Sequence, residues 1–336
     1  MPNVAINGLG RIGRAALKII LDDDRPGDDR LNLVAVNDIA DAENLAYLIK
    51  YDTVYGRYPR DVSADDGALV IDGQRIPAFR HRDPAELPWE ELDVDLVFEC
   101  TGVFKDEDDL KKHLHAGAKS VILSAPTSSE AVPTVVHGVN RPGEPQRIIS
   151  CASCTTNFIT PIVDVAHRHV GIERAVMTTV HAFTAGQNLV DGPHKSVRRG
   201  RSGAANLVPA STGAAKATTR AITELRDRFD GIAVRAPIPV GSIADVVFVA
   251  SRPTSVDEIN EAFRSEAASE RYRDVLGVSE DPLVSSDIVG DPRAAVVDLE
   301  LTRVVDQTLA KVMAWYDNEW GFTNQMVREA RAMLHV

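Results

Sequence analysis

The side chains best suited to chemistry in this sequence are Cys154 and its neighbours. Cys154 lies in the hydroxyl-rich segment 150–157, Ser-Cys-Ala-Ser-Cys-Thr-Thr-Asn, between an apolar pair at 148–149 and an apolar run from Phe158. This order predicts a strand end, a turn and a helix, with the thiol at a helix N-terminus that favours negative charge. Such a position lowers the pKa of a cysteine, and the thiolate is the nucleophile. We therefore interpret Cys154 as reactive, because a dry apolar site, the usual alternative, fits these polar neighbours poorly.

His181 is the side chain that could share a proton with this thiol. It ends a predicted strand at 177–180, and a histidine near a thiolate can stabilise it as an ion pair and then move protons. A histidine at a strand end can also be purely structural. The other histidines lack ligand spacing with cysteines or carboxylates, so the sequence predicts no metal site.

A glycine-rich turn near the N-terminus predicts a dinucleotide site. The motif Gly-Leu-Gly-Arg-Ile-Gly at 8–13, which contains Gly10, Arg11 and Ile12, follows a β-type run and precedes a helical pattern. Its glycines allow a tight turn and a close approach of the backbone to a pyrophosphate. Asp38 ends the next predicted strand, where a carboxylate binds a ribose 2′-hydroxyl and repels a 2′-phosphate. We therefore expect NAD rather than NADP; the alternative is a structural glycine turn with an aspartate helix cap.

The pattern of elements predicts two domains. Strands and helices alternate up to about residue 150, as in a doubly wound α/β (Rossmann) domain, and Thr101 and Ser124 follow strands at the sheet edge where a nucleotide binds. The later β-rich segments with interspersed helices predict an α+β catalytic domain with a mixed sheet, and a helical pattern closes the chain. We expect the NAD-binding domain at 1–153 plus 319–336 and the catalytic domain at 154–318.

Composition narrows the function classes. The net charge of −12 argues against nucleic acid as a primary partner, although Lys195 to Arg201 form a compact basic stretch. The three cysteines form no disulfide framework, and no run is apolar enough to cross a bilayer, so we expect a cytoplasmic protein without membrane contacts. Guanidinium, hydroxyl and helix-start groups suited to small phosphates are present at Arg199, Thr212, Gly213, Thr184 and Arg235.

Five motifs in order resemble one known family. They are Asn-Gly-Leu-Gly-Arg-Ile-Gly-Arg at 7–14, Lys-Tyr-Asp at 50–52, Ala-Ser-Cys-Thr-Thr-Asn at 152–157, Ser-Thr-Gly-Ala-Ala-Lys at 211–216 and Trp-Tyr-Asp-Asn-Glu-Trp-Gly at 315–321. With them the chain resembles the phosphorylating glyceraldehyde-3-phosphate dehydrogenases over essentially its whole length. The resemblance implies oxidation of glyceraldehyde 3-phosphate with NAD and inorganic phosphate by a homotetramer whose segment 184–208 packs between subunits.

The resemblance also implies roles for individual residues. Cys154 would attack the aldehyde carbon, with His181 as the paired base, and the hemithioacetal would become a thioester that phosphate cleaves. Asn318 would orient the nicotinamide carboxamide, Pro193 agrees with Asp38 in favouring NAD, and Gly10, Arg11 and Ile12 would lie along the pyrophosphate. The substrate and phosphate ligands would be Thr184 and Arg235 for the C3 phosphate, Ser153, Thr212, Gly213 and Arg199 for the attacking phosphate, and Thr155 beside them.

Some positions depart from the family pattern. Cys151 replaces a usual Asn and creates Cys-x-x-Cys spacing with Cys154. We prefer the interpretation of a coincidental second thiol, because a permanent disulfide would remove the nucleophile. The hypothesis beside it is that mild oxidation couples the two and reversibly stops the enzyme. Phe322 and Gly186 also differ from common residues, which leaves details of cofactor and substrate positioning open.

Two other functions fit parts of the sequence. A sister enzyme that oxidises erythrose 4-phosphate shares the thiol, histidine and NAD site but releases its thioester to water. An NAD-sensing or RNA-binding regulator on the same fold would bind its partner without turnover.

Overall fold

The computed structural model describes residues 1–26 and 29–335, and its contacts divide the chain into two compact units. The first unit comprises Met1–His137, Arg141–Ser153 and the C-terminal residues from Met326. The second comprises Gly138–Asn140 and Cys154–Gln325. Among the described residues, no helix has the length and apolar character needed to span a membrane.

The first unit is built on an eight-stranded sheet with the order β10-β9-β8-β1-β2-β7-β6-β5. Strands β10, β9, β8, β1, β2 and β7 pair in parallel, whereas β7, β6 and β5 form an antiparallel meander. The strands are β1 (Asn3–Asn7), β2 (Asn32–Asn37), β5 (Val62–Asp65), β6 (Ala68–Ile71), β7 (Gln74–Phe79), β8 (Leu96–Glu99), β9 (Ser120–Leu123) and β10 (Ile148–Ser150), with a separate hairpin of β3 (Tyr51–Asp52) and β4 (Gly56–Arg57). This topology confirms the predicted doubly wound fold.

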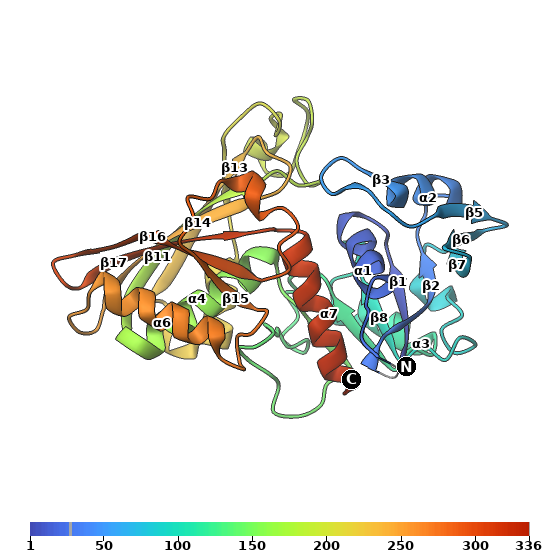
Figure 1. Ribbon diagram of the computed structural model, residues 1–336. Helices are drawn as coiled ribbons and strands as arrows, with labels where there is room; N and C mark the ends of the chain where they lie inside the picture. The colour runs from blue at the N-terminus through green and yellow to red at the C-terminus, as the bar shows by residue number, and fades with distance from the viewer. Residues whose placement is uncertain (27–28, 336) are drawn as a thin grey trace. The chain divides into compact units, whose positions relative to one another are not determined.

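Helices accompany this sheet as its crossovers (Figure 1). They are α1 (Arg11–Leu21), α2 (Ala42–Lys50) and α3 (Glu107–His115), with a 3-10 turn η2 (Pro84–Glu86). Helix α1 buries Ala16, Leu17 and Ile20, and the central strand β1 is completely buried at Val4 and Ile6. Apolar burial on this scale anchors β1, so the polar residues at its carboxyl end are held firmly.

The second unit has a seven-stranded mixed sheet with the order β12-β13-β11-β14-β17-β16-β15. Only the β11–β13 and β15–β16 pairs are parallel. Its strands are β11 (Ile172–Ala182), β12 (Val208–Ser211), β13 (Phe229–Ala236), β14 (Ser242–Ala250), β15 (Leu276–Ser279), β16 (Ala295–Val305) and β17 (Leu309–Tyr316). The predicted α+β domain with a mixed sheet is confirmed.

One face of this second sheet carries the core. Helices α4 (Cys154–Val170), α5 (Ala214–Ala221) and α6 (Val256–Ala268) pack on it, and Figure 1 shows α4 and α6 on the same side of the strands. Burial alternates along β14, as expected for a strand with one covered face. Short 3-10 turns η3 (Val197–Gly200), η4 (Thr223–Leu225) and η5 (Ser285–Ile288) lie in the connections.

The closing helix has residues in both units. Helix α7 (Trp320–Leu334) begins where Asp317 Oδ1 accepts the N–H groups of Glu319 and Trp320 at 2.9 and 2.8 Å. Its residues up to Gln325 belong to the second unit and those from Met326 to the first. The division by contacts thus falls inside one helix, whereas the expected boundary at residue 319 concerns functional domains.

Candidate active site

The thiol and the imidazole singled out by the sequence lie together in the second unit. Cys154 is the first residue of α4, and its Sγ lies 3.3 Å from Nε2 of His181 near the end of β11. His181 is only 2% exposed. The helix start and the strand end therefore place the two groups at a distance that permits proton transfer.

Arg235 completes this cluster from the neighbouring strand. Strands β11 and β13 run parallel with His181 in register with Arg235. Nδ1 of His181 lies 2.6 Å from the carbonyl oxygen of Ala182, and Arg235 Nη1 lies 2.6 Å from Nδ1 and 3.1 Å from that oxygen. Arginine can only donate, so Nδ1 either accepts from Arg235, or carries a proton and donates with Arg235 to the Ala182 carbonyl. When Nδ1 carries a proton and donates it to Ala182, Nε2 is left free to accept the proton of the thiol.

Burial disfavours a charge on either member of the pair alone. Burial raises the pKa of Cys154, although the Arg235 charge and the backbone hydrogen bond from Thr155 act in the opposite direction. Burial, assisted by Arg235, lowers the pKa of His181 to about 3. The net rise for Cys154 corrects the expectation from the helix N-terminus, because burial outweighs it. The thiolate therefore forms together with an imidazolium, when the proton passes from Sγ to Nε2 and creates opposite charges in contact.

A chain of hydrogen-bonded hydroxyl groups lies next to Cys154 and His181. Thr179 donates to the carbonyl of Ile243 at 3.3 Å, and Tyr316 OH lies 2.9 Å from Thr179 Oγ1 and 3.2 Å from Thr155 Oγ1. Because each hydroxyl has one proton, Tyr316 donates to Thr179 and Thr155 donates to Tyr316. The tyrosine ring meets His181 edge-on at 5.8 Å. We did not single out Tyr316 from the sequence; its place within the 315–321 motif was the available signal.

Ser242 links the histidine strand to Asn318. Its hydroxyl accepts the N–H of Ala182 at 3.1 Å and donates to Oδ1 of Asn318 at 2.9 Å. Ser242 is completely buried and Asn318 is 3% exposed. Since Oδ1 is held by a hydroxyl donor, the amide orientation of Asn318 is fixed and its Nδ2 remains the donor for a ligand. Sequence reasoning missed Ser242, which has no local pattern.

The phosphate-binding candidates of the second unit cluster only in part. The positive charge of Arg199 lowers the pKa values of His181 and Arg235, after the larger effect of burial, so the three lie in one electrostatic neighbourhood. Arg199 Nη2 donates to the carbonyl of Ser211 at 3.4 Å, next to Thr212 and to Gly213, the N-cap of α5. This arrangement joins a guanidinium to a helix N-terminus, a combination suited to an anion.

Three other candidates lie in different surroundings. Thr184 follows β11, where its carbonyl accepts the N–H of Gln187 at 2.9 Å. Ser153 belongs to the first unit and Thr155 to the second. The residue before Ser153, Ala152, has a φ of +58°, a left-handed conformation that is strained for a residue with a Cβ and often occurs at functional turns.

The first unit has a cleft of about 340 Å³ at the carboxyl ends of its central strands. Its lining residues are Asn7, Gly8, Gly10, Asn37, Asp38, Ile39, His81, Arg82, Cys100, Thr101, Val103 and Phe104. A Cβ on Gly8 would come within 2.6 Å of Thr101 N, and one on Gly13 within 1.9 Å of the Gly8 carbonyl oxygen. Gly10, by contrast, faces open space. Two glycines thus pack the turn and one leaves it open, as a dinucleotide pyrophosphate requires.

Several polar residues in and around this cleft already form hydrogen bonds or ion pairs within the protein. Asp38 accepts the N–H of Leu9 at 2.7 Å and that of Ala40 at 3.0 Å, one with each carboxylate oxygen, so each oxygen retains a lone pair for a ribose hydroxyl. The Arg11 guanidinium is paired with Asp52 at 2.6 Å, which leaves the backbone of Arg11 and Ile12 in the first turn of α1 to face a phosphate. Ser124 directly follows β9 and donates its N–H to the carbonyl of Glu99 at 3.0 Å.

The second cysteine of the Cys-x-x-Cys pair is not suited to exchange. Within the described residues the three cysteines form no disulfide, and Cys151 is 2% exposed. Burial, together with the negative charge of Glu329, raises the pKa of Cys151 well above its usual value. A protonated, inaccessible thiol is a poor partner in thiol–disulfide exchange, so this finding disfavours the oxidation hypothesis.

A dinucleotide-binding Rossmann unit joined to a unit with a cysteine–histidine pair defines a class, the nicotinamide-dependent dehydrogenases that use a covalent thiol. Comparison with known proteins specifies the family. Residues 2–107 match the family model described as "Glyceraldehyde 3-phosphate dehydrogenase, NAD binding domain", and residues 153–318 match the one described as "Glyceraldehyde 3-phosphate dehydrogenase, C-terminal domain".

Curated relatives match along almost the whole chain. The chain is 48% identical to the glyceraldehyde-3-phosphate dehydrogenase of Mycobacterium avium over 328 residues, 96% of each chain. It is 45% identical to the enzyme of that name from Zymomonas mobilis over 332 residues, 98% of each chain. Glyceraldehyde-3-phosphate dehydrogenase 1 of Streptomyces avermitilis is 47% identical over 327 residues, 96% of each chain. The chain therefore belongs to the glyceraldehyde-3-phosphate dehydrogenase family, and its cofactor is NAD.

Proposed function

We propose that this chain catalyses the reversible, NAD-dependent oxidation and phosphorylation of glyceraldehyde 3-phosphate to 1,3-bisphosphoglycerate. The observation that carries the proposal is the 3.3 Å separation of Cys154 Sγ and His181 Nε2, with Arg235 beside them. Membership of the family supports the same activity.

Covalent catalysis follows from this geometry. His181 accepts the Cys154 proton, the sulfur forms a bond to the aldehyde carbon, and the imidazolium returns the proton to the new oxyanion to give a hemithioacetal. His181 then removes that hydroxyl proton while the carbon is oxidised to a thioester. NAD, when bound, supplies the acceptor for the hydride. A phosphate oxygen finally attacks the thioester carbon, and the Cys154 sulfur leaves as a thiolate.

Two anion sites would hold the phosphates. We assign the C3 phosphate of the substrate to Arg235 and Thr184, and the attacking phosphate to Arg199, Thr212, Gly213 and Ser153, with Thr155 beside the thiol. The N-terminus of α5 and the guanidinium of Arg199 support the second assignment, because both favour anions.

The cofactor assignments use both parts of the chain. Gly10, Arg11 and Ile12 would face the pyrophosphate, Asp38 the ribose, and Thr101 and Ser124 would shape the cleft, with Nδ2 of Asn318 donating to the carboxamide. The open side of Gly10 and the spare lone pairs of Asp38 support these roles. As functional domains we propose 1–153 with 319–336 for NAD binding and 154–318 for catalysis.

We also propose a cytoplasmic homotetramer. Exposed apolar side chains support the assembly: Val176, Val180 and Ile232 lie on the second sheet at 60%, 37% and 55% exposure. Leu189, Val190, Val197 and Leu207 in the segment 184–208 are more exposed still. Apolar surface of this kind marks an interface. Light scattering of the purified protein, expected to give four times the 36.5 kDa chain mass, tests it.

The decisive experiment is a rate matrix of NADH formation. Wild type should require both glyceraldehyde 3-phosphate and inorganic phosphate or arsenate, prefer NAD over NADP, and lose turnover in Cys154→Ser. Oxidation of erythrose 4-phosphate without phosphate would favour the sister enzyme. Partner binding without turnover would favour a regulator.

A further inference from the structure

We propose that Glu99 is a positioning residue of the NAD site: its ionised carboxylate, buried behind the cofactor cleft, fixes the loop 100–104 and the strand ends that form the cleft. The inference deepens the proposed function and rests on NAD occupying this cleft.

The fold gathers three polar strand ends at one place. Asn7, Asn37 and Glu99 are the last residues of β1, β2 and β8, and Asn7 is in register with both of the others. Asn7, Asn37 and the loop residue Thr101 line the cleft, and Glu99 lies behind them with no exposed surface. Polar side chains at the ends of three neighbouring parallel strands are placed where this fold binds nucleotides.

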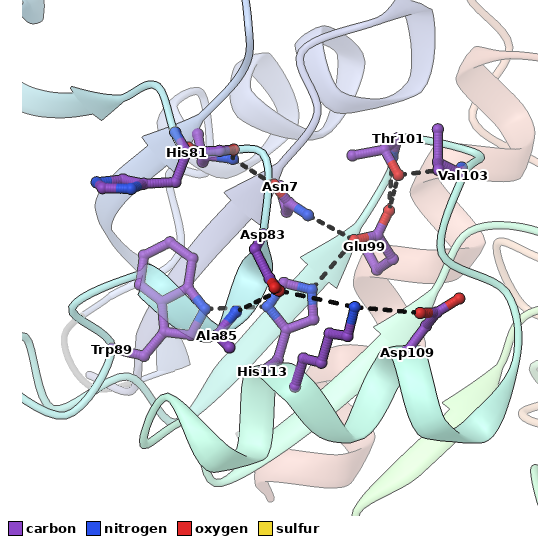
Figure 2. Close-up of polar contacts among 12 residues, drawn as sticks. Asn7, His81, Asp83, Ala85, Trp89, Glu99, Thr101, Val103, Asp109 and His113 are labelled. Carbon is purple, nitrogen blue, oxygen red and sulfur yellow. Dashed lines mark hydrogen bonds and ion pairs between the residues drawn. The ribbon is translucent and has the colours of Figure 1, made fainter.

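Four hydrogen bonds converge on the Glu99 carboxylate (Figure 2). Asn7 Nδ2 lies 2.6 Å from Oε2, and His113 Nε2 lies 3.1 Å from the same oxygen. The backbone N–H of Thr101 donates to Oε1 at 2.8 Å, and the Thr101 hydroxyl also bonds to Oε1. Each carboxylate oxygen thus has two partners, which is its full capacity.

Groups at both ends of the network fix the direction of these bonds. The backbone N–H of His81 can only donate, and it bonds to Oδ1 of Asn37 at 2.9 Å. Nδ2 of Asn37 therefore donates to Oδ1 of Asn7 at 2.7 Å, and Nδ2 of Asn7 is left to donate to Glu99.

The other end is fixed by an indole. Trp89 Nε1 can only donate, and it lies 3.0 Å from Nδ1 of His113, so this nitrogen is the acceptor. The proton of a neutral imidazole then sits on Nε2 and points at Glu99. Figure 2 shows Trp89, His113 and Glu99 in this sequence, with Thr101 on the far side of the carboxylate.

The directions of these hydrogen bonds determine whether the Glu99 carboxyl group carries a proton. A protonated carboxyl group needs an acceptor, but Asn7, His113 and the Thr101 N–H present donors and the Thr101 hydroxyl also donates to Oε1, so the group is a carboxylate held by uncharged partners. Thr101 uses both its polar hydrogens on Glu99, and its Oγ1 accepts the N–H of Val103 at 3.1 Å. The loop cannot shift without leaving a buried charge short of donors, which is the costly outcome. Glu99 therefore acts on NAD through the loop.

The test measures NAD affinity by isothermal titration calorimetry and uses two substitutions of His113, a residue away from the cleft lining. Gln at position 113 can donate to Glu99 and accept from Trp89, whereas Leu can do neither. We expect His113→Leu and Glu99→Gln to raise the NAD dissociation constant by at least about tenfold, as for the loss of a hydrogen bond to a charged group. In His113→Gln the dissociation constant should stay within about twofold of wild type. In His113→Leu the KM for NAD should rise while kcat holds.

Alkylation of Cys154 by iodoacetamide without NAD is the control, and its rate should not change because Cys154 and His181 belong to the other unit. If Glu99→Gln does not fold, Trp89→Phe takes its place. It removes the indole donor together with part of a buried ring, and we expect it to lose NAD affinity. An unchanged affinity in a folded Glu99 or Trp89 variant, or equal losses in His113→Leu and His113→Gln, would overturn the proposal. Failure of wild type itself to bind NAD would instead refute the assignment of the cleft.

Discussion

Arg235 Nη1 lies 2.6 Å from Nδ1 of His181, across two parallel strands that hold the residues in register. The guanidinium therefore stands beside the base rather than remote from it. Its charge lowers the pKa of Cys154 against the larger, opposite effect of burial, and it reinforces the burial that lowers the pKa of His181.

This relationship predicts different effects for two substitutions of Arg235. Lys keeps the positive charge but not the planar guanidinium with its several donors, whereas Gln keeps neither. We expect both to lower kcat/KM for glyceraldehyde 3-phosphate by about 10- to 100-fold. Only Arg235→Gln should markedly slow alkylation of Cys154, because only it removes the charge that favours the thiolate. Equal alkylation rates in wild type and Arg235→Gln would contradict the electrostatic role.

The depressed pKa of His181 predicts a pH dependence of stability. The folded protein holds this imidazole neutral down to about pH 3, whereas the unfolded chain binds a proton below its ordinary pKa of 6.5. Between those values the unfolded state binds more protons, so stability falls as pH falls, by up to about 1.4 kcal/mol per pH unit for one group. Urea unfolding at pH 4.5 to 7 should show a smaller loss in His181→Asn than in wild type. Parallel curves for the two proteins would show that His181 is not the titrating group.

Much of the fold followed from the sequence, because glycine spacing and apolar periodicity are local signals. The Gly8–Gly13 turn and the strand pattern around it were enough to predict the doubly wound sheet. The parallel pairing of β7 with β2, by contrast, was not predicted. Periodicity identifies a strand without naming its partner.

The site was predictable in residue type but not in its environment. The segment around Cys154 indicated a reactive thiol, but the direction of its pKa depends on burial by distant parts of the chain. Tyr316, Ser242 and Glu99 act through partners far away in sequence. Tyr316 at least lies in the 315–321 motif, but no local pattern marks Ser242 or Glu99, so only the structure could identify these two.

Cys151 provides a prediction about oxidation. Because its thiol is buried and its pKa is raised, we expect Cys151→Ser to lose activity to hydrogen peroxide at the wild-type rate and to recover equally with dithiothreitol. Thiol-reversible inactivation would then belong to Cys154 alone. Loss of the reversible component in Cys151→Ser, with mass spectrometry showing a 151–154 disulfide in wild type, would restore the coupling hypothesis.

Ser242 predicts an effect on cofactor orientation that reaches the site through Asn318. In Ser242→Ala, Oδ1 of Asn318 and the N–H of Ala182 both lose their buried partner, which costs about 1–3 kcal/mol for each group left unsatisfied. The Asn318 amide is then free to turn its oxygen toward the ligand, so we expect a higher KM for NAD and a lower melting temperature. Asn318→Asp separates the two effects, because it keeps an acceptor for Ser242 but removes the Nδ2 donor. Asn318→Asp should weaken NAD binding while the hydrogen bond from the Ser242 hydroxyl to residue 318 is kept. If Ser242→Ala melts early yet binds NAD as wild type does, Ser242 stabilises the fold without orienting Asn318.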